Sequence, residues 1–336
     1  MKKYTFIDLF AGIGGFHIGL DEHFDCVFSS EWNPPARKTY SLNFGPQLTE
    51  DNVRFDADIT KVDPKTIPKH TVLCGGFPCQ PFSIAGARKG FAHPTQGTLF
   101  FDIIKIIQEH KPRVLFLENV KNLVSHDGGK TFSTICSSLV AEGYTIKHQI
   151  LNGTTYGNVP QNRERIFLLC FKDADDAANF EFPKSIPLTK KVSDIIDIAD
   201  EKDAKYYQTN IASPSVQKML KEVVNKGAIY QYRRYYLREN KNDVCPTLTA
   251  NMGDGGHNVP LVKDNFGIRK LTPKECLAFQ GFPSDYKLPA ISDSHLYKQV
   301  GNSVVVPVIK RIADNIYTAL EMTDKKKIKK LAKSKK

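Results

Sequence analysis

Short apolar runs alternate with amphipathic stretches through the first half of the chain. The apolar runs predict β-strands at Tyr4–Phe10, Cys26–Ser30, Thr71–Gly75, Arg113–Glu118 and Arg165–Phe171. Apolar positions at helical spacing predict helices at Gly14–His23, Pro34–Asn43, Thr98–His110 and Lys130–Glu142. This alternation is typical of an α/β domain with a doubly wound, mostly parallel sheet. Ligands of such a sheet bind at the carboxyl ends of its strands.

The alternation of apolar runs and amphipathic stretches ends at about Asp173. An acid-rich stretch, Asp194–Asp203, is followed by a basic and aromatic one, Tyr230–Arg238, and then by turn residues at Asn251–Asn258. This composition predicts a second, smaller, loop-rich domain that contains β-structure. A further predicted helix, Val304–Leu320, could return to the large domain.

The length and composition agree with two domains. The chain has 336 residues, of which 41% are hydrophobic, and this is large for a single core. We expect a large domain at 1–175, a small domain at 176–285, a return to the large domain at 286–324 and a Lys-rich tail at 325–336.

The net charge of +11 favours a polyanionic partner. Eight lysines and no acidic residue lie in Lys325–Lys336, so the tail carries most of the excess. We interpret this tail as a solvated, disordered end in preference to a DNA-binding arm.

The termini and cysteines suggest a protein of a reduced compartment. The chain has no leader-like start and no apolar run of membrane-spanning length, so we expect an intracellular protein. Its seven cysteines show no disulfide-like pairing. Cys74 and Cys79 lack the spacing and nearby histidines of a zinc site, so we expect no metal.

A glycine-rich turn follows the first predicted strand, at Phe10–Gly15. Glycines allow the backbone to approach a ligand closely and to adopt positive φ angles. The second strand ends at Glu31, a carboxylate suited to two ribose hydroxyls, and Trp32 could lie against an adenine. Asp58 could accept the adenine amino group. The alternative is that these glycines only turn the chain and that Trp32 only packs.

A candidate nucleophile follows the third predicted strand. Cys79 lies between Pro78 and Pro81, just past the carboxyl edge of the sheet, which favours a presented thiol. A buried structural cysteine is the commoner case for a cysteine taken alone. The next strand brings Glu118 to the same edge.

Three polar side chains, Gln161, Arg163 and Arg165, alternate at the start of the last predicted strand, so they would share one face. They could be a solvated strand end. Beside a cysteine and a glutamate, they would instead form a site for a polar ring.

These residues resemble the ordered motifs of cytosine-5 DNA methyltransferases, in particular the compact bacterial type of restriction-modification systems. The resemblance spans about Tyr4 to Leu320, and the motifs occur in the family's order. The segments that carry it are Phe10–Gly15, Gly76–Ser83, Glu118–Val120, Gln161–Arg165, Leu271–Cys276, Gln280–Pro283 and Gly301–Val304.

The resemblance implies a Rossmann-like, S-adenosylmethionine-dependent enzyme that methylates carbon 5 of a flipped cytosine in a short, specific site of duplex DNA. Cys79 as thiolate would add to carbon 6, and Glu118 would hold ring nitrogen 3 and the amino group. Arg163 and Arg165 would stabilise negative charge near the pyrimidine oxygen and the nucleophile. The base that removes the carbon 5 proton stays open between a water and a side chain.

The resemblance also implies binding residues. The cofactor would be lined by Phe10, Gly12, Gly14, Glu31, Trp32, Asp58, Ile59, Leu99 and Asn302. The DNA contacts would be Gln80, Ser83, Arg233, Arg234, Arg238 and Thr247, with Gln80–Gln96 as a lid and 176–285 as the target-recognition domain. For the arginines, an ordinary solvated face is the alternative. Gln96 stands where many relatives carry arginine, which puts one phosphate contact in doubt.

The biological setting implied is a cytoplasmic bacterial enzyme, at the nucleoid through its substrate. We expect a monomer that shares its cell with a cognate restriction endonuclease without binding it.

Three other functions are weaker. The tRNA-methylating branch of the family shows a Cys-Phe-Thr tripeptide, which is absent here. A catalytically silent DNA-binding module would not need Cys79, Glu118 and both arginines. Cytidine deaminases need zinc ligands that this chain lacks. The DNA sequence recognised cannot be read from residue spacing.

Overall fold

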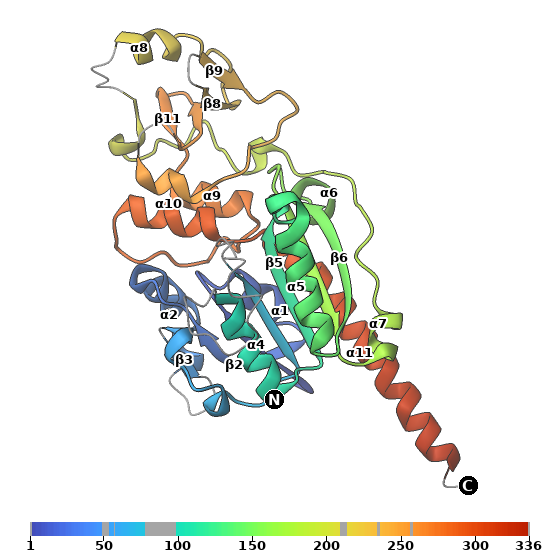
Figure 1. Ribbon diagram of the computed structural model, residues 1–336. Coiled ribbons are helices and arrows are strands. Elements are labelled where there is room, and N and C mark those ends of the chain that lie inside the picture. The colour runs from blue at the N-terminus through green and yellow to red at the C-terminus, as the bar shows by residue number, and fades with distance from the viewer. Residues whose placement is uncertain are drawn as a thin grey trace.

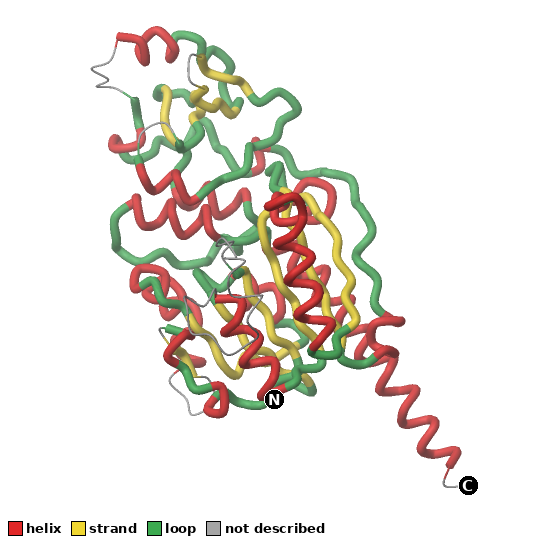
Figure 2. The backbone as a smooth tube through the Cα atoms, in the orientation of Figure 1, coloured by secondary structure: helices red, strands yellow, loops and turns green. Residues whose placement is uncertain are grey.

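A computed structural model describes residues 2–48, 54–56, 58–77, 99–208, 214–233, 236–255 and 258–334. The protein consists of a larger α/β body, which contains both termini, and a smaller body with its own sheet (Figure 1). The tube drawing shows the strands of the larger body side by side, with helices in front of and behind them (Figure 2). Four predicted site residues, Cys79, Gln80, Ser83 and Arg234, lie outside the described residues, as do Gln96 and the rest of the predicted lid.

The described residues of the larger body form a seven-stranded sheet in the order β3-β2-β1-β4-β5-β7-β6. Strands β3, β2, β1, β4 and β5 run parallel, whereas β7 pairs antiparallel with both β5 and β6. The strands are β1 Tyr4–Leu9, β2 Phe24–Ser30, β3 Arg54–Asp56, β4 Val72–Gly76, β5 Val114–Val120, β6 Thr145–Asn152 and β7 Glu164–Phe171.

Helices cover both faces of this sheet, because successive strand residues point to opposite sides. On one face, Phe6 and Phe116 pack with apolar residues of α1 and α11. On the other face, Ile7 and Leu115 pack with α4 and α5. The helices of this body are α1 Gly15–Leu20, α2 Pro34–Leu48, α4 Leu99–His110, α5 Lys130–Ala141, α6 Gly153–Gly157, α7 Ala174–Asn179 and α11 Val306–Ser334. The predicted doubly wound α/β fold is therefore confirmed.

The smaller body contains a four-stranded antiparallel sheet in the order β11-β10-β8-β9 among the described residues. Its elements are α8 Pro214–Leu220, β8 Ile229–Arg233, β9 Tyr236–Glu239, β10 Leu261–Lys263 and β11 Ile268–Lys270. Helices α9 Pro273–Phe279 and α10 Asp293–Asn302 lie between this sheet and the larger body (Figure 1). Short 3-10 helices are η1 Ile59–Lys61, η2 Pro64–Thr66, η3 Lys121–Val124, η4 His126–Gly129, η5 Val192–Asp194, η6 Ala204–Tyr206 and η7 Ala250–Asp254. The exact domain boundaries stay a prediction.

A shared apolar cluster joins the two bodies. Tyr40 and Phe44 of α2 belong to the same buried cluster as Leu248, Phe282 and Val300. Arg269 is fully buried in the smaller body and forms ion pairs with Asp264 and Glu275. Since buried charges need partners, this network fixes β11 against the start of α9.

The prediction of a disordered C-terminal tail was wrong for the described part of the tail. Helix α11 continues without a break to Ser334. Lysine and alanine are favourable helix residues, and Lys325 pairs with Glu321 one turn earlier. Lys327 pairs with Asp173 of the larger body.

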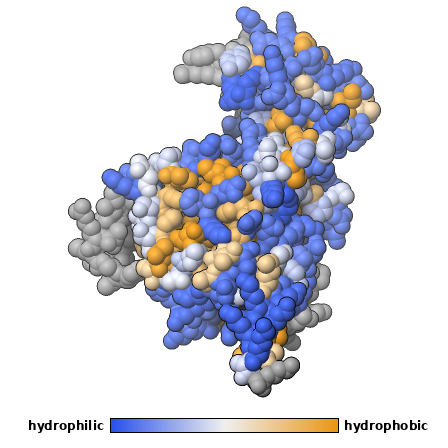
Figure 3. Space-filling view, turned by 90° about the vertical axis from the view of Figure 1, so that its right-hand side faces the viewer, coloured by the Kyte–Doolittle hydropathy of each residue, from blue (hydrophilic) through white to orange (hydrophobic). Residues whose placement is uncertain are grey.

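The surface is mainly hydrophilic on the face shown in Figure 3, with an apolar area on the side of α5 and β6. Among the apolar residues of α5 and β6, Phe132, Ile146 and Ile150 are half buried and Val140 is exposed. No helix among the described residues combines the length and apolar character that crossing a membrane requires.

Candidate active site

The strand register brings the predicted site residues to one edge of the sheet. Leu9 of β1 lies opposite Ser30 of β2 and Gly75 of β4, and Gly76 lies opposite Glu118 of β5. Residues that follow these strand ends therefore share the carboxyl edge, as parallel pairing requires.

The glycine-rich turn after β1 is held by Glu31. Phe10, Gly12 and Gly14 all have positive φ angles, and the Gly12 N–H donates a 2.8 Å hydrogen bond to Glu31 Oε2. The other carboxylate oxygen of Glu31 accepts from the Asn33 N–H at 2.7 Å. Burial raises the pKa of Glu31, and these two backbone N–H groups oppose the rise. The carboxylate thus lies against the turn that was predicted to bind the cofactor.

Two glycines at the end of the turn, Gly14 and Gly15, lack room for a side chain. A Cβ atom on Gly14 would lie 2.2 Å from the ring of Phe44. A Cβ atom on Gly15 would lie 3.0 Å from Ser303 Oγ, so the chain after Asn302 packs against the start of α1. These contacts place Asn302 beside the glycine-rich turn.

The other predicted cofactor residues differ in exposure. The side chain of Trp32 is 77% exposed, as a free stacking surface would be. Ile59 is buried in the cluster that Phe10 and Leu99 border. Asp58 accepts hydrogen bonds from the backbone and hydroxyl of Thr60, so it caps η1. One side of the carboxyl edge therefore combines apolar, aromatic and carboxylate groups.

Glu118 forms the centre of the predicted catalytic group. Arg165 Nε lies 3.0 Å from Glu118 Oε1, and both side chains are largely buried. Burial raises the pKa of Glu118, against the effect of the positive charges of Arg165 and Arg163. A Cβ atom on Gly76 would be 3.0 Å from Glu118 Oε2, so a glycine lets β4 end close to this carboxyl group.

Asn119 is a site residue for which the sequence analysis assigned no role. Its side-chain N–H donates a 2.8 Å hydrogen bond to the carbonyl oxygen of Phe77. Phe77 is the last described residue before the segment that carries Cys79. Asn119 thus anchors the chain just before the segment that carries the predicted nucleophile, and its place within the Glu118–Val120 motif was the sequence signal for it.

The predicted common face of Gln161, Arg163 and Arg165 is not observed as one surface. Arg165 pairs with Glu118, whereas Gln161 donates to the Phe279 carbonyl. Arg163 donates to the carbonyl oxygens of three residues in two other segments, Leu248, Gly301 and Ser303. Strand β7 begins only at Glu164, and residues before it pair with the chain near Cys245. The alternation rule therefore did not apply to the whole triplet.

A cleft of about 470 Å³ is lined by Arg233, Arg238 and Thr247, the predicted DNA contacts that lie among the described residues. Arg233 and Arg238 both donate to Gln231 Oε1, at 3.1 and 2.8 Å. Thr247 Oγ1 donates to the Asn162 carbonyl at 2.6 Å, which joins the two walls of the cleft. The cleft is thus lined by both bodies and is rich in hydrogen-bond donors.

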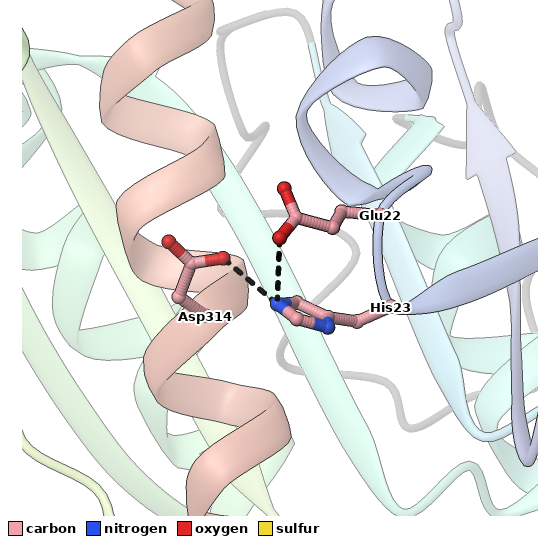
Figure 4. Close-up of side chains that lie close together, drawn as sticks. All are labelled: Glu22, His23 and Asp314. Atoms are coloured by element: carbon pink, nitrogen blue, oxygen red, sulfur yellow. Dashed lines mark hydrogen bonds and ion pairs between the residues drawn. The ribbon is translucent and has the colours of Figure 1, made fainter.

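One group of side chains among the described residues could hold a metal ion, but it lies away from this edge. Figure 4 shows Glu22, His23 and Asp314 turned toward one another, with His23 Nε2 3.0 Å from Asp314 Oδ1. His23 directly precedes β2, so it is at the opposite end of the strands from Glu31. Lys310 already neutralises Glu22 through a 2.5 Å ion pair. These contacts join the end of α1 to α11.

Solved structures with the same fold are methyltransferases. The chain resembles the structure of a DNMT2 mutant from Spodoptera frugiperda, with a TM-score of 0.69, 20% identity and coverage of 94% of this chain and 100% of that one. It also resembles a putative DNA modification methyltransferase encoded within a prophage of E. coli, with a TM-score of 0.68, 19% identity and coverage of 95% and 100%. At these identities the likeness concerns the fold alone.

Sequence relatives are closer. The chain is 48% identical over 314 residues to the type II methyltransferase M.Bsp6I of Bacillus sp. strain RFL6, covering 93% of this chain and 98% of the relative. It is 40% identical over 329 residues to the type II methyltransferase M.HhaI of Haemophilus parahaemolyticus, covering 94% of each. Residues 4–318 match the profile of the family described as C-5 cytosine-specific DNA methylase. The match covers nearly the whole chain, and the chain belongs to this family.

Proposed function

We propose that this methyltransferase transfers a methyl group from S-adenosylmethionine to carbon 5 of a cytosine flipped out of a short, specific site in duplex DNA. The observation that carries the proposal is the carboxyl edge of the sheet. Glu118, buried and paired with Arg165, lies there beside the end of β4, from which the chain continues to Cys79. By analogy with its relatives, the enzyme would protect host DNA in a restriction-modification system.

The residues at the glycine-rich turn fit the cofactor. At Gly12 only the Phe10 carbonyl oxygen lies within 4 Å of where a Cβ atom would be, so the turn is open at this point. Glu31 offers carboxylate oxygens suited to ribose hydroxyls, and Trp32, the next residue, is exposed. When bound, S-adenosylmethionine would supply an electrophilic methyl group, and S-adenosylhomocysteine would remain as the leaving group. The residues proposed to hold it are Phe10, Gly12, Gly14, Glu31, Trp32, Asp58, Ile59, Leu99 and Asn302.

The chemistry begins with Cys79. Its thiolate forms a bond to carbon 6 of cytosine, and the electron pair of the 5,6 double bond moves to carbon 5, which takes the methyl group. A base then removes the carbon 5 proton, the double bond reforms and the Cys79 thiolate leaves. The cytosine must leave the stack because these atoms are not reachable inside a duplex.

Glu118 stabilises the ring during addition. Because burial raises its pKa, the carboxyl group keeps a proton to higher pH and can donate it to ring nitrogen 3. Arg165 fixes the orientation of Glu118 and places positive charge where negative charge develops. Arg163 adds a second positive charge near Glu118.

The cleft between the two bodies is proposed to bind the duplex. Its lining includes Arg233, Arg238 and Thr247, and its donors suit phosphate oxygens and base edges. Gln80, Ser83 and Arg234, which lie outside the described residues, are proposed to contribute from neighbouring segments.

The test is covalent trapping on DNA that carries 5-fluorocytosine at the target. The target is first identified by bisulfite sequencing of plasmid DNA from cells that express the protein. With S-adenosylmethionine present, the wild type should give a complex that survives denaturing electrophoresis, because fluorine cannot leave carbon 5 as a proton does. Cys79→Ser should lose the complex and nearly all turnover, since a hydroxyl is a far poorer nucleophile near neutral pH.

Cys74→Ser is the matched control. Cys74 is fully buried in β4, its Sγ donates to the Ile7 carbonyl, and burial raises the pKa of its thiol well above the usual range. This variant should still trap DNA. Trapping by Cys79→Ser, or loss of trapping only in Cys74→Ser, would overturn the assignment of the nucleophile.

A further inference from the structure

Arg163 lies where three separate segments of the chain meet. Its Nη1 donates a 2.7 Å hydrogen bond to the carbonyl oxygen of Leu248, which belongs to the segment that lines the cleft. Its Nη2 donates to the carbonyl oxygens of Gly301, at 3.1 Å, and Ser303. The guanidinium group is buried, so water cannot readily replace it as the donor to these carbonyl oxygens.

The contacted carbonyls flank two proposed binding elements. Leu248 follows Thr247, which is proposed to contact DNA. Gly301 and Ser303 stand on either side of Asn302, which is proposed to contact the cofactor. One planar guanidinium group therefore holds the two elements in a single arrangement.

The two elements also touch each other directly. A Cβ atom on Gly301 would lie 2.1 Å from the carbonyl carbon of Thr249, so only a glycine allows this approach. Gln161, two residues before Arg163, accepts from the Leu248 N–H at 3.4 Å. Movement of either element must consequently displace the other or break hydrogen bonds of buried groups.

We propose that Arg163 is a positioning residue that couples cofactor binding to DNA binding through its bonds to Leu248, Gly301 and Ser303. Leaving a buried carbonyl without its donor is costly, so a ligand that orders the segment around Asn302 also orders the segment around Thr247. This inference rests on the proposed function and adds to it a coupling between the two proposed binding elements.

The experiment measures the affinity of a fluorescent duplex that contains the target site, with and without S-adenosylhomocysteine. The wild type should bind the duplex about tenfold more tightly with S-adenosylhomocysteine, within the usual range of coupling between sites. In Arg163→Lys the ratio of the two affinities should fall severalfold towards one, because an ammonium group keeps the charge but cannot reproduce the planar fork. The affinity for S-adenosylhomocysteine with and without duplex must change by the same factor, since coupling is reciprocal.

Arg165→Lys is the control that separates coupling from chemistry. Arg165 contacts Glu118 and its own neighbour Glu164, not the two binding elements. This variant should lose turnover and keep the wild-type ratio. A ratio in Arg163→Lys equal to that of the wild type would overturn the proposal, as would a ratio of one in a wild type that methylates DNA. Failure of the wild type to methylate DNA at all would instead overturn the proposed function.

Hydrogen exchange of the wild type gives a second measurement that needs no variant. S-adenosylhomocysteine alone should slow amide exchange at 247–250 at least severalfold, although no proposed cofactor residue lies there. Unchanged exchange in this segment would contradict the coupling, whatever the stability of the Arg163 variant.

Discussion

Asp8 is an acidic residue inside an apolar strand, and its environment explains why it is tolerated. It lies in β1 between Ser29 and Cys74 of the neighbouring strands and is fully buried. Its carboxylate accepts from the backbone N–H of His17, in the first turn of α1, while Oδ2 has no hydrogen-bond partner among the described residues. Asp8 thus caps α1 from within the sheet and helps to fix the glycine-rich turn.

We predict that Asp8→Asn stabilises the protein at alkaline pH relative to the wild type. Burial, and next the charge of Glu31, raise the pKa of Asp8 well above 3.8, so the folded protein favours the neutral form. The stability that this group contributes is complete at low pH and is lost as the pH rises through the raised pKa. The loss is about 1.4 kcal/mol for each pH unit that separates the pKa of Asp8 in the folded and unfolded chains. Asparagine stays neutral and keeps the oxygen that accepts from His17.

Urea unfolding at pH 5 and pH 8 measures this difference. The free energy of unfolding of Asp8→Asn, relative to the wild type, should be larger at pH 8 than at pH 5. A difference that does not change with pH would show that Asp8 is not protonated in the folded protein.

At the scale of elements, the β8–β9 ribbon carries the arginines that are proposed to contact DNA. Gln231 of β8 lies directly opposite Arg238 of β9, and Arg233 lies opposite Tyr236, so these four side chains share one face. The opposite face packs Tyr230 and Leu237 into an apolar cluster. Strand β10 pairs only with Ile229 and Tyr230 of β8, so beyond this point β8 and β9 continue as a two-stranded ribbon. Such a ribbon fits the major groove, where arginine most often reads guanine.

We therefore predict that Arg233→Ala or Arg238→Ala relaxes the preference for a guanine in the methylated site. The loss of one base contact of this kind costs about 1–3 kcal/mol, or about 5- to 150-fold in discrimination. Methylation of a duplex library with single substitutions measures this effect. Lys241→Ala, at the same cleft, is the control, because a phosphate contact should weaken all sequences alike. If both arginine variants methylated every duplex in the library less well by the same factor, base reading by these arginines would be excluded.

At the scale of the whole molecule, the Lys-rich end of α11 extends away from the smaller body. Both chain ends lie at the same end of the larger body, opposite α9, α10 and the second sheet (Figure 1). Lys325 and Lys327 are engaged in ion pairs with Glu321 and Asp173. The excess positive charge of the chain is therefore concentrated far from the cleft.

We predict that deletion of residues 328–336 changes neither the methylated sequence nor the turnover rate. The truncation keeps Lys327 and its ion pair. The affinity for a short duplex that contains only the target site should keep its dependence on salt concentration. Only lysines that contact phosphate release counterions from the DNA, and so only they contribute to this dependence. Anisotropy titrations at several salt concentrations test this. A shallower slope of log affinity against log salt concentration in the truncated protein would show that the deleted lysines contact DNA.

The sequence by itself determined the layered fold and the chemical groups of the site. Periods of two and of about 3.6 residues are local properties, so most predicted strands and helices agree with the structure to within a few residues. Because parallel strands end at one edge, the sequence also placed Glu31 and Glu118 on the same rim. Strand β6 was not predicted, because Lys147, His148 and Gln149 interrupt the apolar pattern of this strand at the edge of the sheet.

Only the tertiary structure decided which partner each site residue meets. Arg163 and Arg165 are two residues apart, yet one contacts the segments of Leu248 and Ser303 and the other contacts Glu118. The reason is physical: the chain leaves the sheet before Glu164 and pairs with a segment more than eighty residues away. Spacing fixes which side chains are available, but long-range packing fixes which of them are buried, paired and held in place.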